Sequence, residues 1–115
     1  MRFRLTTAFK RGGFSCLPSD FPAYPGATYG GASYSLNAPT PGNYCRIVLE
    51  SNDAVGPVDD FYASRLSTGD WKVVSSDAAA GQIAFKNTKR AGTTGTVSVV
   101  PRNDHSEITV QLYTP

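Results

Sequence analysis

Short runs in which inward and outward residues alternate dominate the second half of this chain. Four runs follow residue 70, and their inward positions are Trp71, Val73 and Ser75, then Ile83 and Phe85, then Val97 and Val99, and last Ile108, Val110 and Leu112. A period of two residues is typical of strands with one buried face. The intervening turn-like stretches, at 76–81, 87–95 and 101–106, are too short for the crossovers of parallel strands. We therefore expect antiparallel neighbours and a sheet with one solvated face.

A single helical stripe precedes these runs. Its apolar positions follow the spacing i, i+3, i+4 and i+8, at Val58, Phe61, Tyr62 and Leu66. This period predicts a helix over residues 54–68. Ser51, Asn52 and Asp53 offer short polar side chains for its N-terminal cap, and Gly69 stands where a left-handed stop is expected.

The first half of the chain predicts two further strands. Residues 44–50 alternate, with Cys45, Ile47 and Leu49 on one face, and a short strand is expected at about 27–36. Prolines and glycines crowd residues 17–42 and exclude long regular elements there. Aromatic residues nevertheless give this stretch anchors, so we expect an extended segment packed on the domain. The predicted fold class is α+β, with one helix packed on a mainly antiparallel sheet of five or six strands.

Charge separates the N-terminus from the rest of the chain. The first eleven residues carry four basic groups, Arg2, Arg4, Lys10 and Arg11, whereas the remainder holds seven basic and nine acidic residues, a balance of −2. Residues 1–16 lack the apolar region of a signal peptide, and no run approaches the ~18 apolar residues of a membrane span. We expect residues 1–16 to be a disordered basic leader. Residues 17–115 should form a single domain with one core.

The two cysteines, Cys16 and Cys45, leave two interpretations open. Cys45 shares a strand face with Ile47 and Leu49, which favours a small buried hydrophobic residue. A Cys16–Cys45 disulfide is the alternative. A metal site is disfavoured, because no further cysteine or histidine lies near either residue.

The candidates for catalysis are few. Asp59 and Asp60 are adjacent and diverge on a helix, so their charges are better explained by the positive end of the helix dipole. Asp104, His105 and Ser106 contain the residue types of a hydrolase or a cation site. Consecutive residues in a turn, however, rarely converge as a triad must. The glycines at 92 and 95 lack the lysine of a phosphate-binding loop. We expect no enzyme activity, no cofactor and no metal.

Five residues are candidates for ligand contact: Lys86, Lys89, Arg90, Tyr24 and Tyr34. The three basic residues cluster at an expected hairpin tip, where they can bind an anionic polymer or simply aid solubility. Trp71 or a tyrosine beside them would add stacking. Tyr24 and Tyr34 fall on expected outward or loop positions. Trp71, Phe61 and Tyr62 are better explained by core packing, because each has a large apolar area to bury.

Several of these motifs together resemble a small domain of bacterial extracytoplasmic proteins. The shared features are Phe21-Pro-Ala-Tyr-Pro-Gly-Ala27, a helix with the pattern Val58-x-x-Phe-Tyr-x-x-x-Leu66, and a glycine–tryptophan pair at its end. The resemblance covers about residues 17–113. It implies no catalytic activity and transfers no functional residue. This chain departs from the pattern at Asp70, which separates Gly69 from Trp71, and in lacking an intact export signal.

These observations favour a non-enzymatic binding or interaction module of the bacterial cell envelope, located outside the cytoplasm or secreted. Its partner would be a protein or another envelope component. The alternative is an intracellular module that associates with anions or nucleic acid through the basic leader and the loop at 86–90. Nucleic acid is the less favoured partner, since residues 12–115 carry no net positive charge. A small hydrolase built on Asp104, His105 and Ser106 is the third hypothesis.

Overall fold

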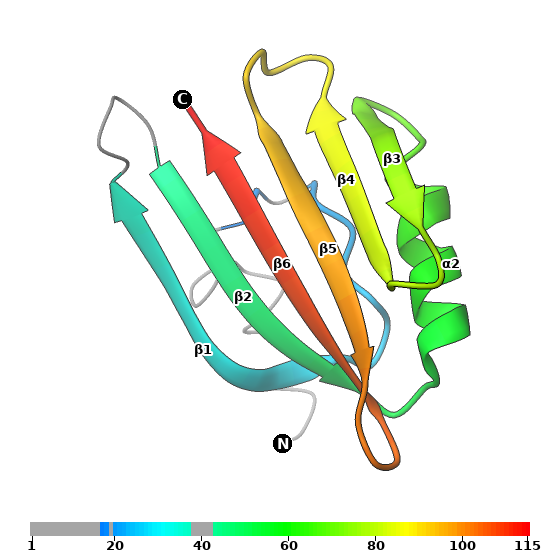
Figure 1. Cartoon of the computed structure of the whole chain (residues 1–115). Coiled ribbons are helices and arrows are strands. Elements are labelled where there is room, and N and C mark those ends of the chain that lie inside the picture. The colour runs from blue at the N-terminus through cyan, green and yellow to red at the C-terminus, as the bar shows by residue number, and fades with distance from the viewer. Residues whose placement is uncertain (1–16, 19, 38–42) are drawn as a thin grey trace.

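The computed structural model describes residues 17, 18, 20–37 and 43–115. In this part of the chain, six strands form one sheet with the order β1-β2-β6-β5-β4-β3, and every neighbouring pair is antiparallel (Figure 1). The elements are β1 (Thr28–Asn37), β2 (Asn43–Ser51), α2 (Val55–Arg65), β3 (Trp71–Asp77), β4 (Gln82–Asn87), β5 (Thr94–Pro101) and β6 (Ser106–Thr114). The predicted α+β class, with a helix on an antiparallel sheet, is confirmed. The predicted leader, residues 1–16, lies outside the described residues.

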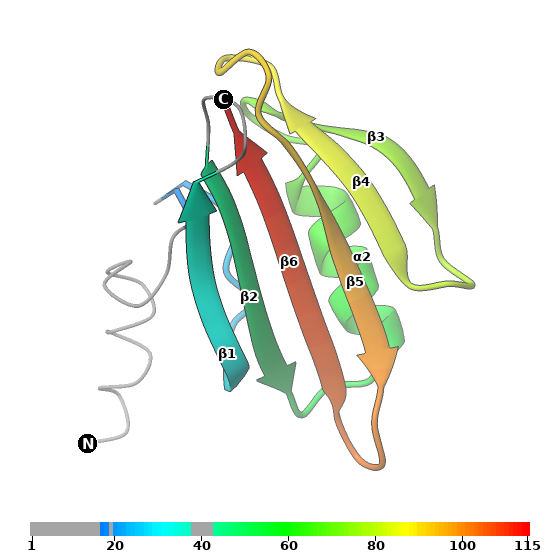
Figure 2. The same ribbon diagram turned by 60° about the vertical axis from the view of Figure 1, so that its left-hand side comes forward.

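The helix α2 covers one face of the sheet, beside β3, β4 and β5 (Figures 1 and 2). Its predicted apolar stripe supplies Val58, Tyr62 and Leu66, which are completely buried. They meet the inward residues of the strands, among which Ile47, Val97, Ile108 and Val110 are also completely buried. Burial of this apolar surface is the main force that holds the helix on the sheet.

The segment before β1 completes the core beside the helix, as its aromatic anchors predicted. The Phe21 ring packs edge-on against Trp71 and tilted against Phe85, with centroids 5.5 Å apart in both pairs. Tyr24 makes an edge-on contact with Phe61 at 5.0 Å. Aromatic pairs in such geometries add stability beyond the area that they bury.

Both ends of α2 differ from the prediction. The helix ends at Arg65, because the hydroxyls of Ser67 and Thr68 donate to the carbonyls of Ala63 and Arg65 and turn the chain early. Gly69 does adopt the left-handed conformation, with φ of 62°. At the other end, Ala54 occupies the cap position without a side-chain hydrogen bond. The Ser51 hydroxyl accepts from the Asp53 amide instead of capping the helix.

The position of Asp59 and Asp60 beyond the first turn of α2 corrects the interpretation of their charges. The helix begins at Val55 and has no acidic residue in its first turn, so neither charge lies at the positive end of the dipole. Asp59 is buried, and its Oδ1 atom has no hydrogen-bond partner among the described residues. Burial, aided by the neighbouring charge of Asp60, raises the pKa of the Asp59 carboxyl.

A bulge interrupts the alternation predicted for β3. Val73 pairs with Phe85 and Ser75 pairs with Ala84, so two steps along β3 match one step along β4. Val74 is the extra residue and is 61% exposed. The bulge shifts the pleat by one residue, and Ser75 is therefore exposed and not inward as predicted.

Candidate binding face

The face of the sheet opposite α2 carries the outward residues of the strands, and no helix of the described chain covers it (Figure 2). We call it the open face. Hydroxyl and amide groups occupy its middle, at Thr94, Thr96, Ser98, Thr109 and Gln111. Because antiparallel partners lie directly opposite one another, these residues form rows that cross the strands.

One row runs from β3 to β2 through residues paired directly across the sheet: Lys72, Lys86, Thr94, Tyr113 and Tyr44. The next row contains Ala84, Thr96, Gln111 and Arg46. The Tyr44 hydroxyl donates to Oε1 of Gln111 over 2.7 Å and joins the two rows. This bond occupies the amide oxygen of Gln111 and leaves its NH₂ group as the donor for other partners.

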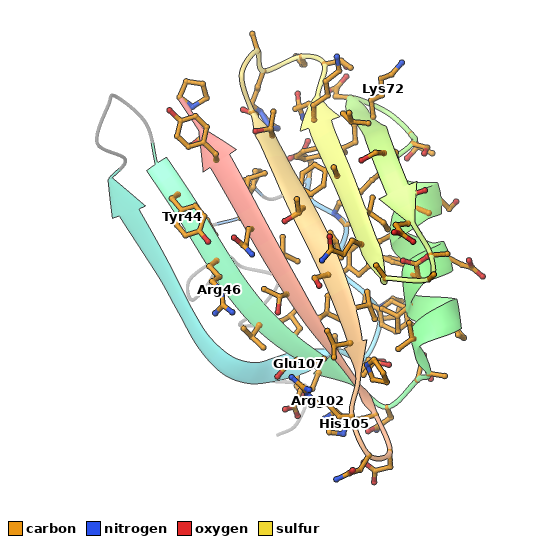
Figure 3. All side chains as sticks on the ribbon, viewed as in Figure 1. Tyr44, Arg46, Lys72, Arg102, His105 and Glu107 are labelled. Atoms are coloured by element: carbon orange, nitrogen blue, oxygen red, sulfur yellow. The ribbon has the colours of Figure 1, made fainter. Side chains whose placement is uncertain are left out.

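Three lysines gather at the β3 end of the first row. Lys72 and Lys86 face each other in the β3–β4 pair, and Lys89 follows in the loop between β4 and β5. All three are exposed, and within the described part of the chain none forms an ion pair. We call these residues the lysine corner; Figure 3 shows Lys72 at the opposite end of the sheet from Glu107.

Buried Asn87 fixes the loop that carries Lys89. Its Oδ1 atom accepts hydrogen bonds from the backbone amides of Lys89, at 2.9 Å, and Arg90, at 2.7 Å. The backbone N–H of Asn87 donates to the Thr93 carbonyl at 2.9 Å. Because the backbone of this loop is already fixed, it loses little conformational entropy when the loop side chains bind a ligand.

Arg90, predicted as a ligand contact, is instead part of the fold. Its guanidinium donates to both carboxylate oxygens of Asp20, at 2.9 and 3.0 Å. It also lies 5.9 Å from the centroid of the Trp71 ring. Trp71 is only 6% exposed, and its indole N–H donates to the Asp20 carbonyl. Trp71 therefore offers no stacking surface, whereas Lys86 and Lys89 keep the exposure that the prediction requires.

The two tyrosines predicted as ligand contacts have different outcomes. Tyr24 lies in the loop before β1, as one of the two predicted positions had it, but its side chain is in the core with 8% exposure and is not available as a surface contact. Its hydroxyl donates to the Asp53 carboxylate, and this bond with burial raises its pKa to about 12. Tyr34 pairs with Arg46 in the β1–β2 register, but its side chain falls outside the described residues.

The other end of the open face is acidic. The Arg102 guanidinium bonds the Glu107 carboxylate at 2.6 Å, and His105 lies between Asp104, at 3.1 Å, and Glu50, at 3.9 Å. The hydrogen bond from His105 holds the pKa of the Asp104 carboxyl below its usual value. Glu50, Arg102, His105 and Glu107 line a depression of ≈ 580 Å³, and Figure 3 shows the last three close together at this end of the sheet.

Asp104 and His105 contact each other at 3.1 Å, contrary to the predicted divergence, but Ser106 diverges from both as predicted. Ser106 is completely buried, and its hydroxyl donates to the Asp53 carbonyl at 2.7 Å. His105 turns the other way, toward Asp104 and Glu50. A nucleophile must meet both its base and its substrate, and this serine meets neither. Among the described residues, no group of three or more acidic, histidine or cysteine side chains could hold a metal ion.

Cys45 is buried, as expected, but it is disulfide-bonded. The interpretation of Cys45 as an unbonded hydrophobic residue is therefore wrong, and sequence alternation could not reveal this because it reports only burial. Cys16, the other cysteine of the chain, lies outside the described residues.

Lys72 is the residue of the lysine corner that the sequence analysis missed. It stands 14 positions before Lys86, and only the strand register brings the two together. The alternation around Trp71 and Val73 already placed Lys72 on the outward face, which was the available signal. No described helix is long and apolar enough to cross a membrane. Comparisons of the chain with protein-family models, curated proteins and solved structures find no match.

Proposed function

We propose that this chain is a non-enzymatic binding module of the bacterial cell envelope, which binds an anionic envelope polymer through its open face. The observation that carries the proposal is the lysine corner. Its three ammonium groups are exposed and have no carboxylate partner among the described residues. Positive charge without an internal partner attracts an anionic ligand and accelerates its association.

The distribution of charge directs an anionic ligand to the lysine end of the open face. Lysines occupy one end of the open face, whereas Glu50, Asp104 and Glu107 occupy the other. An anionic chain is attracted to the first end and repelled from the second. The hydroxyl and amide groups between them suit a polar backbone that lies on the strands.

Two structural observations support a location outside the cytoplasm and a non-enzymatic function. The disulfide at Cys45 favours an oxidising compartment, since disulfides are rare in the cytosol. The buried Ser106 hydroxyl is engaged by a backbone carbonyl, which weakens the hydrolase hypothesis. The resemblance to extracytoplasmic domains points in the same direction.

The lysine corner also suits the second candidate, a module that associates with nucleic acid. Proteins that bind single strands add aromatic surfaces on which bases stack. Trp71 is buried beside the lysines and is not free for this role, whereas Tyr113 and Tyr44 lie in the first row of the open face. We favour an envelope polymer because the disulfide at Cys45 favours an oxidising compartment.

The test measures binding of the full chain to three polyanions at low salt: inorganic polyphosphate, polygalacturonate and oligothymidylate. We expect binding to at least one of the first two, with an affinity that decreases as salt is raised. The double variant Lys72→Gln/Lys86→Gln should lose affinity about tenfold or more, because each charge-assisted bond contributes about 1.5–3 kcal/mol.

Arg65→Gln is the matched control, because it removes one positive charge from α2 on the other side of the sheet. It should keep nearly all of the affinity. The proposal is wrong if none of the polyanions binds, or if the double lysine variant binds as tightly as the unmodified chain. Oligothymidylate binding at least tenfold tighter than polyphosphate would establish the nucleic-acid alternative.

A further inference from the structure

We propose that the ligand is a polyol phosphate, a chain in which phosphodiesters alternate with hydroxyl-bearing units. This inference rests on the proposed function. It lies across the strands along the row Lys72, Lys86, Thr94, Tyr113 and Tyr44. Its phosphates bind at the lysine corner, and its hydroxyls bind over β5, β6 and β2.

The type of cation left unpaired at this corner favours phosphate. The guanidinium of Arg90 is already paired with Asp20, because its Nη2 atom donates to both carboxylate oxygens. What remains is ammonium groups, each with three donors that rotate freely. Such point charges bind the tetrahedral oxygens of phosphate without a requirement for planar alignment.

The register of β3 and β4 places two lysines where both can contact one phosphate group of the ligand. Side chains directly opposite in an antiparallel pair have Cβ atoms about 4.5–5.5 Å apart, so Lys72 and Lys86 can both reach one phosphate. Thr94 is the direct partner of Lys86 on the next strand, and its hydroxyl can donate to the same group. Lys89, in the loop that follows β4, can take the neighbouring phosphate.

The rest of the row favours neutral polar units. Neighbouring strands are about 4.8 Å apart, so the five strands of the row span about 19 Å. Over the last three of these strands lie Thr96 and Gln111, whose amide is oriented by the Tyr44 hydroxyl. Arg46, the partner of Gln111, adds one positive charge over β2. Hydroxyl and amide groups exchange hydrogen bonds with ligand hydroxyls, which inorganic polyphosphate lacks.

The experiment compares lipid-free poly(glycerol phosphate), inorganic polyphosphate and polygalacturonate by isothermal titration calorimetry with the full chain. Poly(glycerol phosphate) should bind most tightly per charge. Thr94→Val, which replaces a hydroxyl by a methyl of similar shape, should weaken its binding about fivefold, the size of one neutral hydrogen bond. Thr109→Val, on the same face but outside the row, is the matched control and should bind as the unmodified chain does.

The outcomes separate this inference from the proposed function. Polygalacturonate or polyphosphate binding as tightly as poly(glycerol phosphate) would overturn the inference and leave the proposed function standing. Equal affinities of the Thr94→Val and Thr109→Val variants would also overturn it. Absence of binding to all three polymers would overturn both.

Discussion

Lys72 and Lys86 stand directly opposite each other in the antiparallel pair of β3 and β4. Both are exposed, and neither forms an ion pair within the described chain. Like charges at directly opposed positions destabilise a sheet. The same two residues therefore have opposite effects on the fold and on the proposed binding.

Lys72→Glu should stabilise the protein while it weakens polyanion binding. The substitution replaces a repulsive cross-strand pair with an attractive one, so the free energy of unfolding should rise by about 0.2–1 kcal/mol. Urea denaturation at low and high salt measures the change, which should shrink as salt screens the charges. The free energy of unfolding of Lys72→Gln should lie between those of the unmodified chain and of Lys72→Glu. A loss of stability in Lys72→Glu would contradict the repulsion between these lysines.

Tyr24→Phe should destabilise the protein by about 1.5–3 kcal/mol at neutral pH, because it removes a hydrogen bond to the Asp53 carboxylate. The pKa of Tyr24 is raised to about 12 from 10.0. Its contribution should therefore be complete below pH 10 and disappear as the pH rises through 12. Denaturation across this range should show the loss in the unmodified chain and not in Tyr24→Phe. Equal stability of the two proteins at pH 7 would contradict this assignment.

Asp59→Ala should raise the free energy of unfolding more than Asp60→Ala at pH 7. Both changes improve helix propensity equally, but only Asp59 is buried with an unpartnered oxygen. The difference should be about 1 kcal/mol, the lower range for an unpaired buried polar group. Because the pKa of the Asp59 carboxyl is raised, its destabilising effect develops as the pH rises above the ordinary carboxyl pKa and is complete above the raised pKa. The difference should therefore shrink as the pH falls, and an equal gain in both variants would refute it.

From the disulfide at Cys45 we predict an oxidising compartment in the native cell and a loss of stability when the disulfide is reduced. Protein recovered from its native cells, and alkylated before lysis, should contain no free thiol. Reduction should lower the free energy of unfolding by about 2–4 kcal/mol. Two free thiols in the native protein would contradict the oxidised state and remove a support for the envelope location.

Local patterns were sufficient to predict the fold class. The spacing of Val58, Tyr62 and Leu66 indicated the helix, and the alternation of Ile108, Val110 and Leu112 indicated a half-buried strand; all six are completely or almost completely buried. Such periods are properties of a single element. They carry no information on which strands become neighbours.

The features that the sequence did not reveal depend on contacts between distant residues. Arg90 is bound by Asp20, 70 positions away, and Lys72 meets Lys86 only through strand register. Tyr24 was expected at an outward or loop position, yet its ring is packed against Phe61, 37 positions away. A bulge such as that at Val74 likewise leaves no mark on residue alternation before the strand pairs.

The most direct test of the open face as the binding surface is a two-dimensional ¹⁵N–¹H NMR titration of the full chain with sodium tripolyphosphate. Binding at the lysine corner should shift the amide signals of Lys72, Lys86, Lys89 and Thr94. The signals of Val58, Tyr62 and Leu66 on α2 should stay in place. Shifts confined to α2, or no shifts at saturating tripolyphosphate, would contradict the proposed binding face.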